Sequence, residues 1–160
     1  MIHPINTPRL ILRRPFQSDA DEFFDLVKDE ETCRLAGYPH CAAMDQAFFM
    51  GFKMLWADLD NRLFVIVPGD GRMVGTIHVQ PDEEAHTARL HLALHPDYRR
   101  LGYGSEILRA LMTQLREAGF KVLSCAVAED NAPALAFFHQ LGFTPCGSDA
   151  QGKCLLTLRL

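Results

Sequence analysis

The sequence lacks the patterns typical of membrane, secreted and general nucleic-acid-binding proteins. No uninterrupted apolar run reaches the length of a membrane span, and residues 1–4 lack the basic region and apolar core of a signal peptide. The net charge of −4 lacks the basic excess that contacts with nucleic-acid phosphates require. These absences predict a cytoplasmic protein with no membrane or nucleic-acid partner.

The chain also lacks the cysteine spacing of a disulfide framework or a zinc site. Its five cysteines are an odd number and form no C-x-x-C pair: Cys33, Cys41, Cys125, Cys146 and Cys154. Secreted disulfide scaffolds and zinc sites need paired or closely spaced cysteines. We therefore expect reduced thiols and no metal cofactor.

The most informative feature of the sequence is a segment with two glycines, residues 99–104. It follows an apolar run and precedes a pattern of helical spacing, so a strand is expected to enter a loop that opens a helix. The free amides of a first helical turn attract anions, and glycine lets an anion approach closely. No lysine follows Gly104, and Ile107 stands where a dinucleotide fingerprint has its third glycine. The segment therefore predicts a phosphate site that is neither a Walker loop nor a dinucleotide fold.

The remaining periodicities predict one α/β domain over residues 1–160, a length that one domain typically has. Predicted strands cover residues 9–13, 63–67, 73–79, 88–94, 121–127, 143–146 and 154–160. Predicted helices cover residues 18–27, 45–59, 103–119 and 131–142, with residues 35–40 as an irregular connection and residues 81–84 as a loop.

Two local details follow from the first helices. Ser18 and Asp21 have the spacing of a capping box, which predicts the start of the first helix. In the second helix, an aromatic stripe is expected to be core: Phe48, Phe49, Phe52 and Trp56. Trp56 and Tyr38, which lies in the connection between the helices, are further candidates for the wall of an acceptor pocket.

Three segments resemble the GNAT superfamily of N-acyltransferases along essentially the whole chain. The pattern Arg99-x-x-Gly102-x-Gly104 is similar to its coenzyme A pyrophosphate loop, and NAPALAFFHQLGF at residues 131–143 resembles its second motif. The opening TPRLILR at residues 7–13 resembles the branch that includes acetylases of ribosomal-protein N-termini. The resemblance implies a single domain with a central mixed, mostly antiparallel sheet flanked by helices.

The resemblance further implies that acetyl-CoA is the co-substrate and which residues hold it. The pyrophosphate would lie on the loop formed by Arg99, Arg100, Leu101, Gly102, Tyr103, Gly104 and Ser105. The pantetheine arm would pair with the backbone of Leu92, Ala93 and Leu94, where one N–H polarises the thioester carbonyl. Solvated arginines and plain sheet core are the alternatives. Asn131 either bonds the pantetheine or only caps a helix.

The catalytic groups are less well defined. Phe138 stands where many relatives have a tyrosine that protonates the leaving thiolate, so we expect Phe138 to pack against the cofactor arm. The glutamate that some relatives use as base is absent from the strand beginning at Ala88. His78 and His91, on the two central strands, are candidate bases because imidazole accepts protons near neutral pH, although a strand histidine can be merely structural.

These features predict an N-acetyltransferase that moves an acetyl group directly to a primary amine, without a covalent cysteine intermediate. The expected acceptor is the α-amine of a protein or peptide. The alternatives are a small amine (a polyamine, an amino acid or an aminoglycoside), or a catalytically weak module that binds or senses coenzyme A. Either a monomer or a homodimer is compatible with the sequence.

Overall fold

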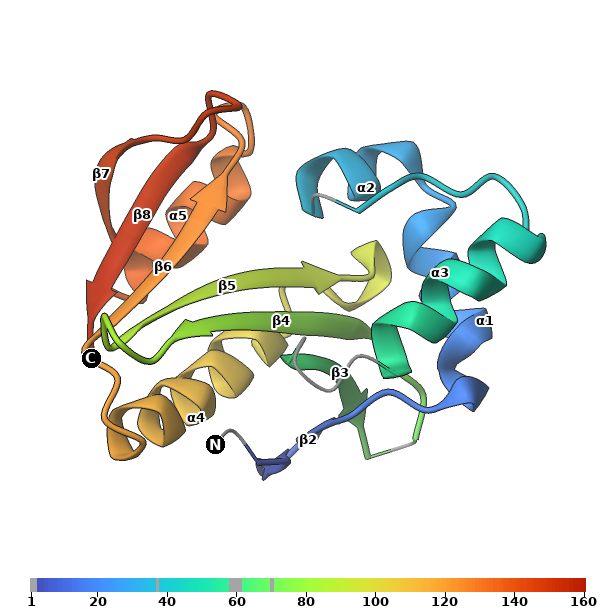
Figure 1. The fold of residues 1–160 in the computed structure, drawn as a ribbon, viewed down its shortest axis with the longest axis horizontal. Helices are drawn as coiled ribbons and strands as arrows, with labels where there is room; N and C mark the ends of the chain where they lie inside the picture. Colours follow the sequence, from blue (N-terminus) through green and yellow to red (C-terminus); the bar gives the residue numbers. More distant parts are fainter. Residues whose placement is uncertain (1–2, 37, 58–61, 70) are drawn as a thin grey trace.

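The computed structural model describes residues 3–36, 38–57, 62–69 and 71–160. Within them, eight strands form one sheet in the order β1-β2-β3-β4-β5-β6-β8-β7 (Figure 1). The pair β5 and β6 is parallel and every other neighbouring pair is antiparallel. The strands are β1 Ile5–Asn6, β2 Leu10–Arg13, β3 Arg62–Pro68, β4 Gly75–Asp82, β5 Thr87–Leu94, β6 Val122–Val127, β7 Thr144–Ser148 and β8 Cys154–Arg159. The predicted mixed, mostly antiparallel sheet is confirmed.

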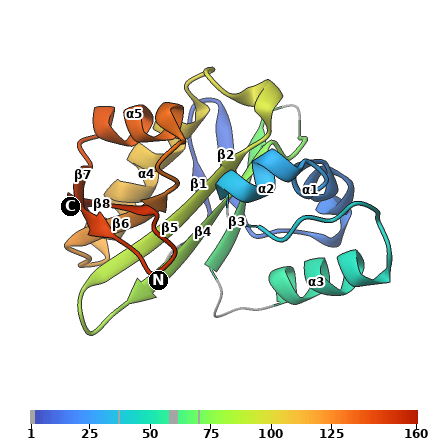
Figure 2. The same cartoon turned by 90° about the horizontal axis from the view of Figure 1, so that it is seen from above.

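Helices cover both faces of this sheet (Figure 2). They are α1 Ala20–Val27, α2 Glu30–Ala36, α3 Gln46–Ala57, α4 Tyr103–Glu117 and α5 Ala132–Gln140. A cluster of buried side chains from α4, α5 and the sheet includes Ile107, Leu111 and Phe138. A second cluster joins α1 and α3 to β3 through Phe23, Phe52 and Val65. The sheet is therefore the middle layer of three.

The helix α2 was not predicted, and it occupies part of the expected irregular connection. Asp29 stabilises its start, because Oδ2 accepts from the backbone N–H of Thr32 at 2.8 Å and from its hydroxyl at 2.6 Å. The segment of seven residues is too short to show an apolar period. Asp29, a residue type that commonly caps helices, was the only local sequence feature that indicated the start of α2. Three α-helices, not two, thus stand between β2 and β3 among the described residues.

The predicted capping box at Ser18 and Asp21 is wrong, because a 3-10 turn at Gln17–Asp19 precedes α1. Asp19 performs this role instead: its Oδ2 accepts from the N–H of Phe16 at 2.7 Å. Arg13 also holds this buried carboxylate through two hydrogen bonds, at 2.8 and 2.9 Å. Arg13 is thereby occupied in joining β2 to the start of α1.

The aromatic stripe of α3 is only partly core. Phe48 and Phe52 are buried, but Phe49 is 47% exposed. Phe49 is adjacent to Phe48 in sequence, so it leaves the buried face of the helix while its ring still contacts Phe48 edge-on at 5.3 Å. Leu55 and Trp56 lie in the helical part of the chain, but their side chains, like Leu59 as a whole, lie outside the described residues.

The hairpin of β4 and β5 differs from the prediction at both ends of β4. Met73 and Val74 are buried but precede the strand, and the expected loop at residues 81–84 is partly strand. Pairing continues to Asp82 opposite Thr87, whereas the last described pairing with β3 is at Val79. Pro81 therefore lies beyond the last described pairing of β4 with β3, in the part of β4 that pairs with β5.

Candidate active site

The parallel strands β5 and β6 separate soon after they meet, and this separation creates the site. Their pairing covers three positions and ends at Arg89 opposite Ser124. From Leu90 onward the edge of β5 that faces β6 has no strand partner among the described residues. A cavity of about 50 Å³ lies in the gap, lined by Leu90, His91 and Leu92 from β5 and by Cys125, Ala126 and Val127 from β6. An unpaired strand edge offers backbone donors and acceptors to an extended ligand.

A larger cavity of about 760 Å³ lies beside the end of β5. Most of the predicted cofactor residues line it: Leu92, Ala93, Leu94, Arg99, Arg100, Gly102, Tyr103, Gly104, Ser105, Asn131 and Phe138. Leu101 does not line it, and its side chain is 48% exposed. The smaller cavity shares Leu92, Asn131 and Phe138 with the larger one. The two cavities therefore lie against the same end of β5 and the same face of α5.

The loop between β5 and α4 presents backbone amides to the larger cavity. The first hydrogen bond of α4 runs from the N–H of Glu106 to the carbonyl of Gly102 at 3.1 Å. The amides of Tyr103, Gly104 and Ser105 therefore precede the helical ladder and are suited to an anion. Gly102 has a φ of +79°, a left-handed conformation that favours glycine. The backbone thus fits the predicted pyrophosphate cradle.

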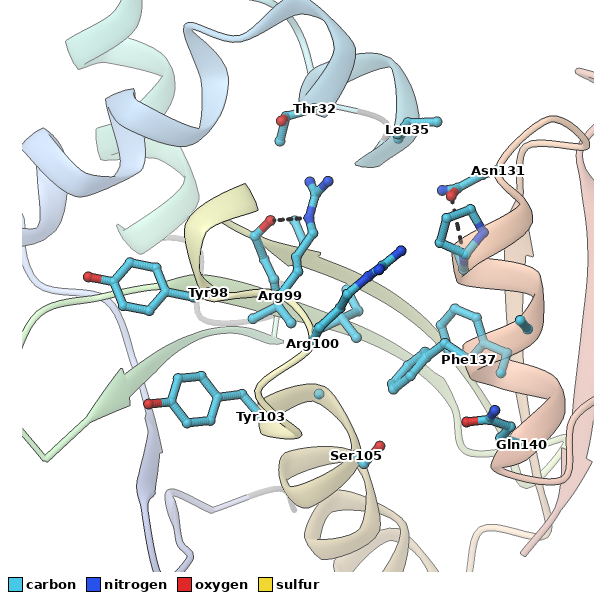
Figure 3. A pocket seen from close by; sticks show the side chains of 18 of the residues that line it. Thr32, Leu35, Tyr98, Arg99, Arg100, Tyr103, Ser105, Asn131, Phe137 and Gln140 are labelled. Carbon is cyan, nitrogen blue, oxygen red and sulfur yellow. Dashed lines mark hydrogen bonds between the residues drawn. The ribbon is translucent and has the colours of Figure 1, made fainter.

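Two arginines of this loop extend from it in different directions (Figure 3). Arg99 donates from Nε to the carbonyl of Leu94 at 3.1 Å, which ties its side chain to the end of β5. Arg100 extends toward Asn131 at the start of α5. Its backbone φ of +62° is unusual for a residue with a side chain. The loop conformation therefore brings a second guanidinium to the cavity at a cost in local strain.

The N-terminal segment braces this loop through contacts that no local sequence pattern predicts. Glu106 accepts from the Thr7 hydroxyl at 2.6 Å and from the Arg9 backbone N–H at 2.9 Å. The Arg9 guanidinium donates to Glu106 Oε2 at 2.6 Å and to the carbonyl of Leu101 at 2.8 Å. It also lies 5.0 Å from the centre of the Tyr103 ring. The brace therefore links the opening TPRL segment, α4 and the loop.

We expect Glu106→Gln to raise the dissociation constant for acetyl-CoA about tenfold, because charge-assisted bonds that hold the loop are lost. Hydrogen bonds from Thr7 and Arg9 keep the pKa of the Glu106 carboxyl below its usual value, so the carboxylate is charged. Calorimetric titration measures the change, with Glu117→Gln at the exposed end of α4 as the matched control. Equal affinities in the two variants would show that the brace does not shape the loop.

Asn131 and Phe138 lie on the α5 side of the cavity. The side-chain oxygen of Asn131 accepts from the N–H of Ala134 at 3.3 Å, so this residue caps α5. Phe138 is 6% exposed and its ring packs against Phe143. A phenyl ring cannot donate a proton, and its position against both cavities fits the predicted packing role.

Phe138 has no hydroxyl, and the tyrosines near the cavity do not supply one in its place. The hydroxyls of Tyr98 and Tyr103 point away from Asn131 and Phe137 (Figure 3). The Tyr38 hydroxyl shares a hydrogen bond of 2.6 Å with Thr76, and burial raises its pKa to about 12. None of these tyrosines therefore presents its hydroxyl to the α5 side of the cavity, where Phe138 lies.

His78 and His91 are directly opposite on β4 and β5, with stacked rings whose centres are 5.9 Å apart. Only His91 lines the small cavity between β5 and β6. Burial, together with the nearby charges of His78, Arg89 and Lys153, lowers the pKa of His91 to about 4. The ring is consequently neutral near physiological pH and can accept a proton, although a pKa this low makes it a weak base.

The helix α2, missed in the sequence, forms the opposite wall of the larger cavity through Glu31, Thr32, Arg34 and Leu35. Arg34 reaches across to Asp130, with a shortest nitrogen-to-oxygen distance of 3.1 Å.

Within the described parts of the chain, no three metal-binding side chains cluster, and none of the helices combines the length and apolar character needed to cross a membrane.

Comparison with known proteins decides the family. A model of the acetyltransferase (GNAT) family matches residues 13–143. The chain belongs to this family. An acetyltransferase of Yersinia pestis is 28% identical over 97 residues, which are 61% of this chain and 68% of that protein. Streptothricin acetyltransferase of Streptomyces lavendulae is 33% identical over 96 residues, covering 58% of this chain and 50% of that enzyme.

Solved GNAT structures share the fold of this chain over nearly its whole length. An acetyltransferase of Bacillus anthracis has a TM-score of 0.82 at 16% identity, with 98% of each chain covered. A Vibrio cholerae protein assigned as a ribosomal-protein-serine acetyltransferase has a TM-score of 0.77 at 18% identity, covering 98% of this chain and 97% of that one. The microcin C7 self-immunity acetyltransferase MccE, solved with acetyl-CoA and AMP, has a TM-score of 0.81 at 15% identity, covering 96% and 94%.

Proposed function

We propose that residues 1–160 act as one N-acetyltransferase domain that transfers an acetyl group from acetyl-CoA to a primary amine. The observation that carries this proposal is the unpaired end of β5, which includes the neutral His91 and leads to the amide cradle at α4. Acetyl-CoA would place its pyrophosphate on the amides of residues 101–105 and its pantetheine arm along Leu92, Ala93 and Leu94. Acetyltransferase membership and the chemistry of these groups support this assignment.

The transfer proceeds by direct attack. The amine nitrogen forms a bond to the acetyl carbon, an N–H of β5 stabilises the charge on the carbonyl oxygen, and the carbon–sulfur bond breaks. Coenzyme A leaves as the thiolate, which takes a proton from water. His91 accepts the proton that the new amide nitrogen loses. Cys125 lines the small cavity, but burial raises its pKa to about 12, which makes its thiol a poor nucleophile.

The proposed acceptor is the α-amine of a protein or peptide. Support comes from the opening at residues 7–13, which resembles the ribosomal-protein branch and here braces the cofactor loop. A small amine is the second candidate, since the relative from Streptomyces lavendulae is named for streptothricin, a small molecule. Fold alone does not choose between them, because one scaffold accepts many substrates.

The test is the release of coenzyme A with three pools of acceptors: peptides with free N-termini, polyamines and aminoglycosides. We expect peptides to be turned over and mass spectrometry to place the acetyl group on the terminal amine. Activity confined to a small-molecule pool would refute the peptide acceptor. Binding of acetyl-CoA without release on any amine would favour a sensing module, and parallel double-reciprocal plots would contradict direct attack.

A further inference from the structure

An arginine, Arg89, lies beside the proposed reaction centre. Arg89 and His91 are two residues apart on β5, so their side chains project from the same face of the sheet. Arg89 is also the last residue that pairs with β6 before the two strands separate. About two residues of strand, or roughly 7 Å, therefore separate it from the histidine that lines the gap.

The hydrogen-bond donors of Arg89 are incompletely satisfied. Its Nε is buried and has no hydrogen-bond partner among the described residues. The Asp149 carboxylate forms an ion pair with Arg89 at an Nη2-to-Oδ2 distance of 3.7 Å, which is too long for a hydrogen bond. The other oxygen of Asp149 is engaged by the backbone N–H groups of Gln151 and Lys153. The exposed part of the Arg89 side chain is therefore held only by this loose ion pair and can donate to an added acceptor.

Arg89 brings a cationic side chain beside His91 on the same face of β5, and its charge helps to lower the pKa of the histidine. One carboxylate, Asp149, faces Arg89 from the turn between β7 and β8. The Arg89 side chain is 40% exposed, so a ligand can reach it. An acceptor with a second positive charge would be repelled here, whereas a carboxylate or phosphate would be attracted.

We propose that the acceptor carries an anionic group, a carboxylate or a phosphate, a few bonds from the amine, and that Arg89 binds this group. The inference rests on the proposed N-acetyltransferase function and narrows its substrate class. A free amino acid, an acidic residue at the start of a peptide and a phosphorylated amine all share this chemistry. Polyamines do not, although the net charge of the whole chain is negative.

Matched acceptors that differ in charge test this inference. The pairs are phenylalanine and its amide, peptides beginning Ser-Glu and Ser-Gln, and phosphoethanolamine and ethanolamine. We expect kcat/KM to be about tenfold higher for the anionic member of at least one pair, and that pair identifies the source of the charge. Equal or faster turnover of the neutral member in all three pairs would overturn the inference.

Variants separate recognition of charge from a structural role of Arg89. We expect Arg89→Gln to bring the preference in that pair to within about twofold, and Arg116→Gln, at an exposed position in the last turn of α4, to preserve it. An equal loss of kcat/KM for the charged and neutral members would instead mean that Arg89 only holds β5 to the turn between β7 and β8.

Binding of the product keeps the inference testable without turnover. The N-acetylated products of all three pairs are titrated calorimetrically into the complex with coenzyme A. We expect the anionic product of at least one pair to bind about tenfold more tightly than its neutral partner, and Arg89→Gln to remove the difference. Equal binding within all three pairs would refute the anionic acceptor. Absence of turnover with all amines, alongside preferential binding of an anionic product, would refute the proposed activity alone.

Discussion

Gly102→Ala is expected to weaken acetyl-CoA binding about tenfold or more. The glycine has a φ of +79°, and an added Cβ would lie 3.1 Å from Nη2 of Arg9. Arg9 donates to the carbonyl of Leu101, so its displacement would change the loop that presents the amides. The left-handed conformation alone costs alanine about 1 kcal/mol, which would appear as lower stability and not as weaker binding.

Gly152→Ala is the control that separates these effects. Gly152 has a φ of +78°, nothing lies within 4 Å of its added Cβ, and it is in the turn between β7 and β8. Both variants should lower the melting temperature by a similar amount, and only Gly102→Ala should raise the dissociation constant measured by calorimetry. Unchanged affinity in Gly102→Ala would mean that this loop does not hold the cofactor.

Valine at the neighbouring Gly104 would be a less specific test than the sequence suggests. A Cβ there would lie 3.0 Å from Cζ of Phe137, in the contact between α4 and α5. From the sequence alone, close approach of an anion is the expected reason for this glycine. In the structure it also allows two helices to pack, so valine would combine loss of binding with disturbed packing.

His91→Gln is expected to lower kcat about 100-fold while leaving the affinity for acetyl-CoA unchanged. The reason is that His91 lines the gap between β5 and β6 with a neutral ring, whereas His78 contacts that ring from β4. Steady-state kinetics measures kcat, and His139→Gln, at an exposed position near the end of α5, is the matched control. A kcat equal to that of the control would exclude His91 as the proton acceptor.

The pH dependence gives an independent check on the same residue. Burial lowers the pKa of His91 to about 4, so its basic form is present throughout the neutral range and is lost only as the pH falls through that value. The rate should therefore show no inflection at the usual histidine pKa of about 6.5. It should rise toward the pKa of an α-amine, about 8, as the acceptor loses its proton. A flat profile, with chemistry shown to be rate-limiting, would contradict control by proton removal.

Local sequence patterns were sufficient to predict most of the strands and helices and the proposed cofactor loop. Alternating and helical apolar spacing predicted most strands and the helices α1, α3, α4 and α5, because each such element buries one face. The glycines and arginines at residues 99–104 predicted a phosphate site because free amides at a helix start need no distant partner. The short helix α2 was not predicted, because seven residues are too few to show a helical period of apolar residues.

Contacts between distant segments were decided only by the tertiary structure. The sequence gives no sign that Arg9 and Glu106, 97 positions apart, form one ion pair, or that Arg89 faces Asp149. It offered His78 and His91 as equal candidates, and only the separation of β5 from β6 distinguishes them. The local backbone follows from neighbouring residues, whereas burial and charge at a site depend on which remote side chains the folded sheet brings together.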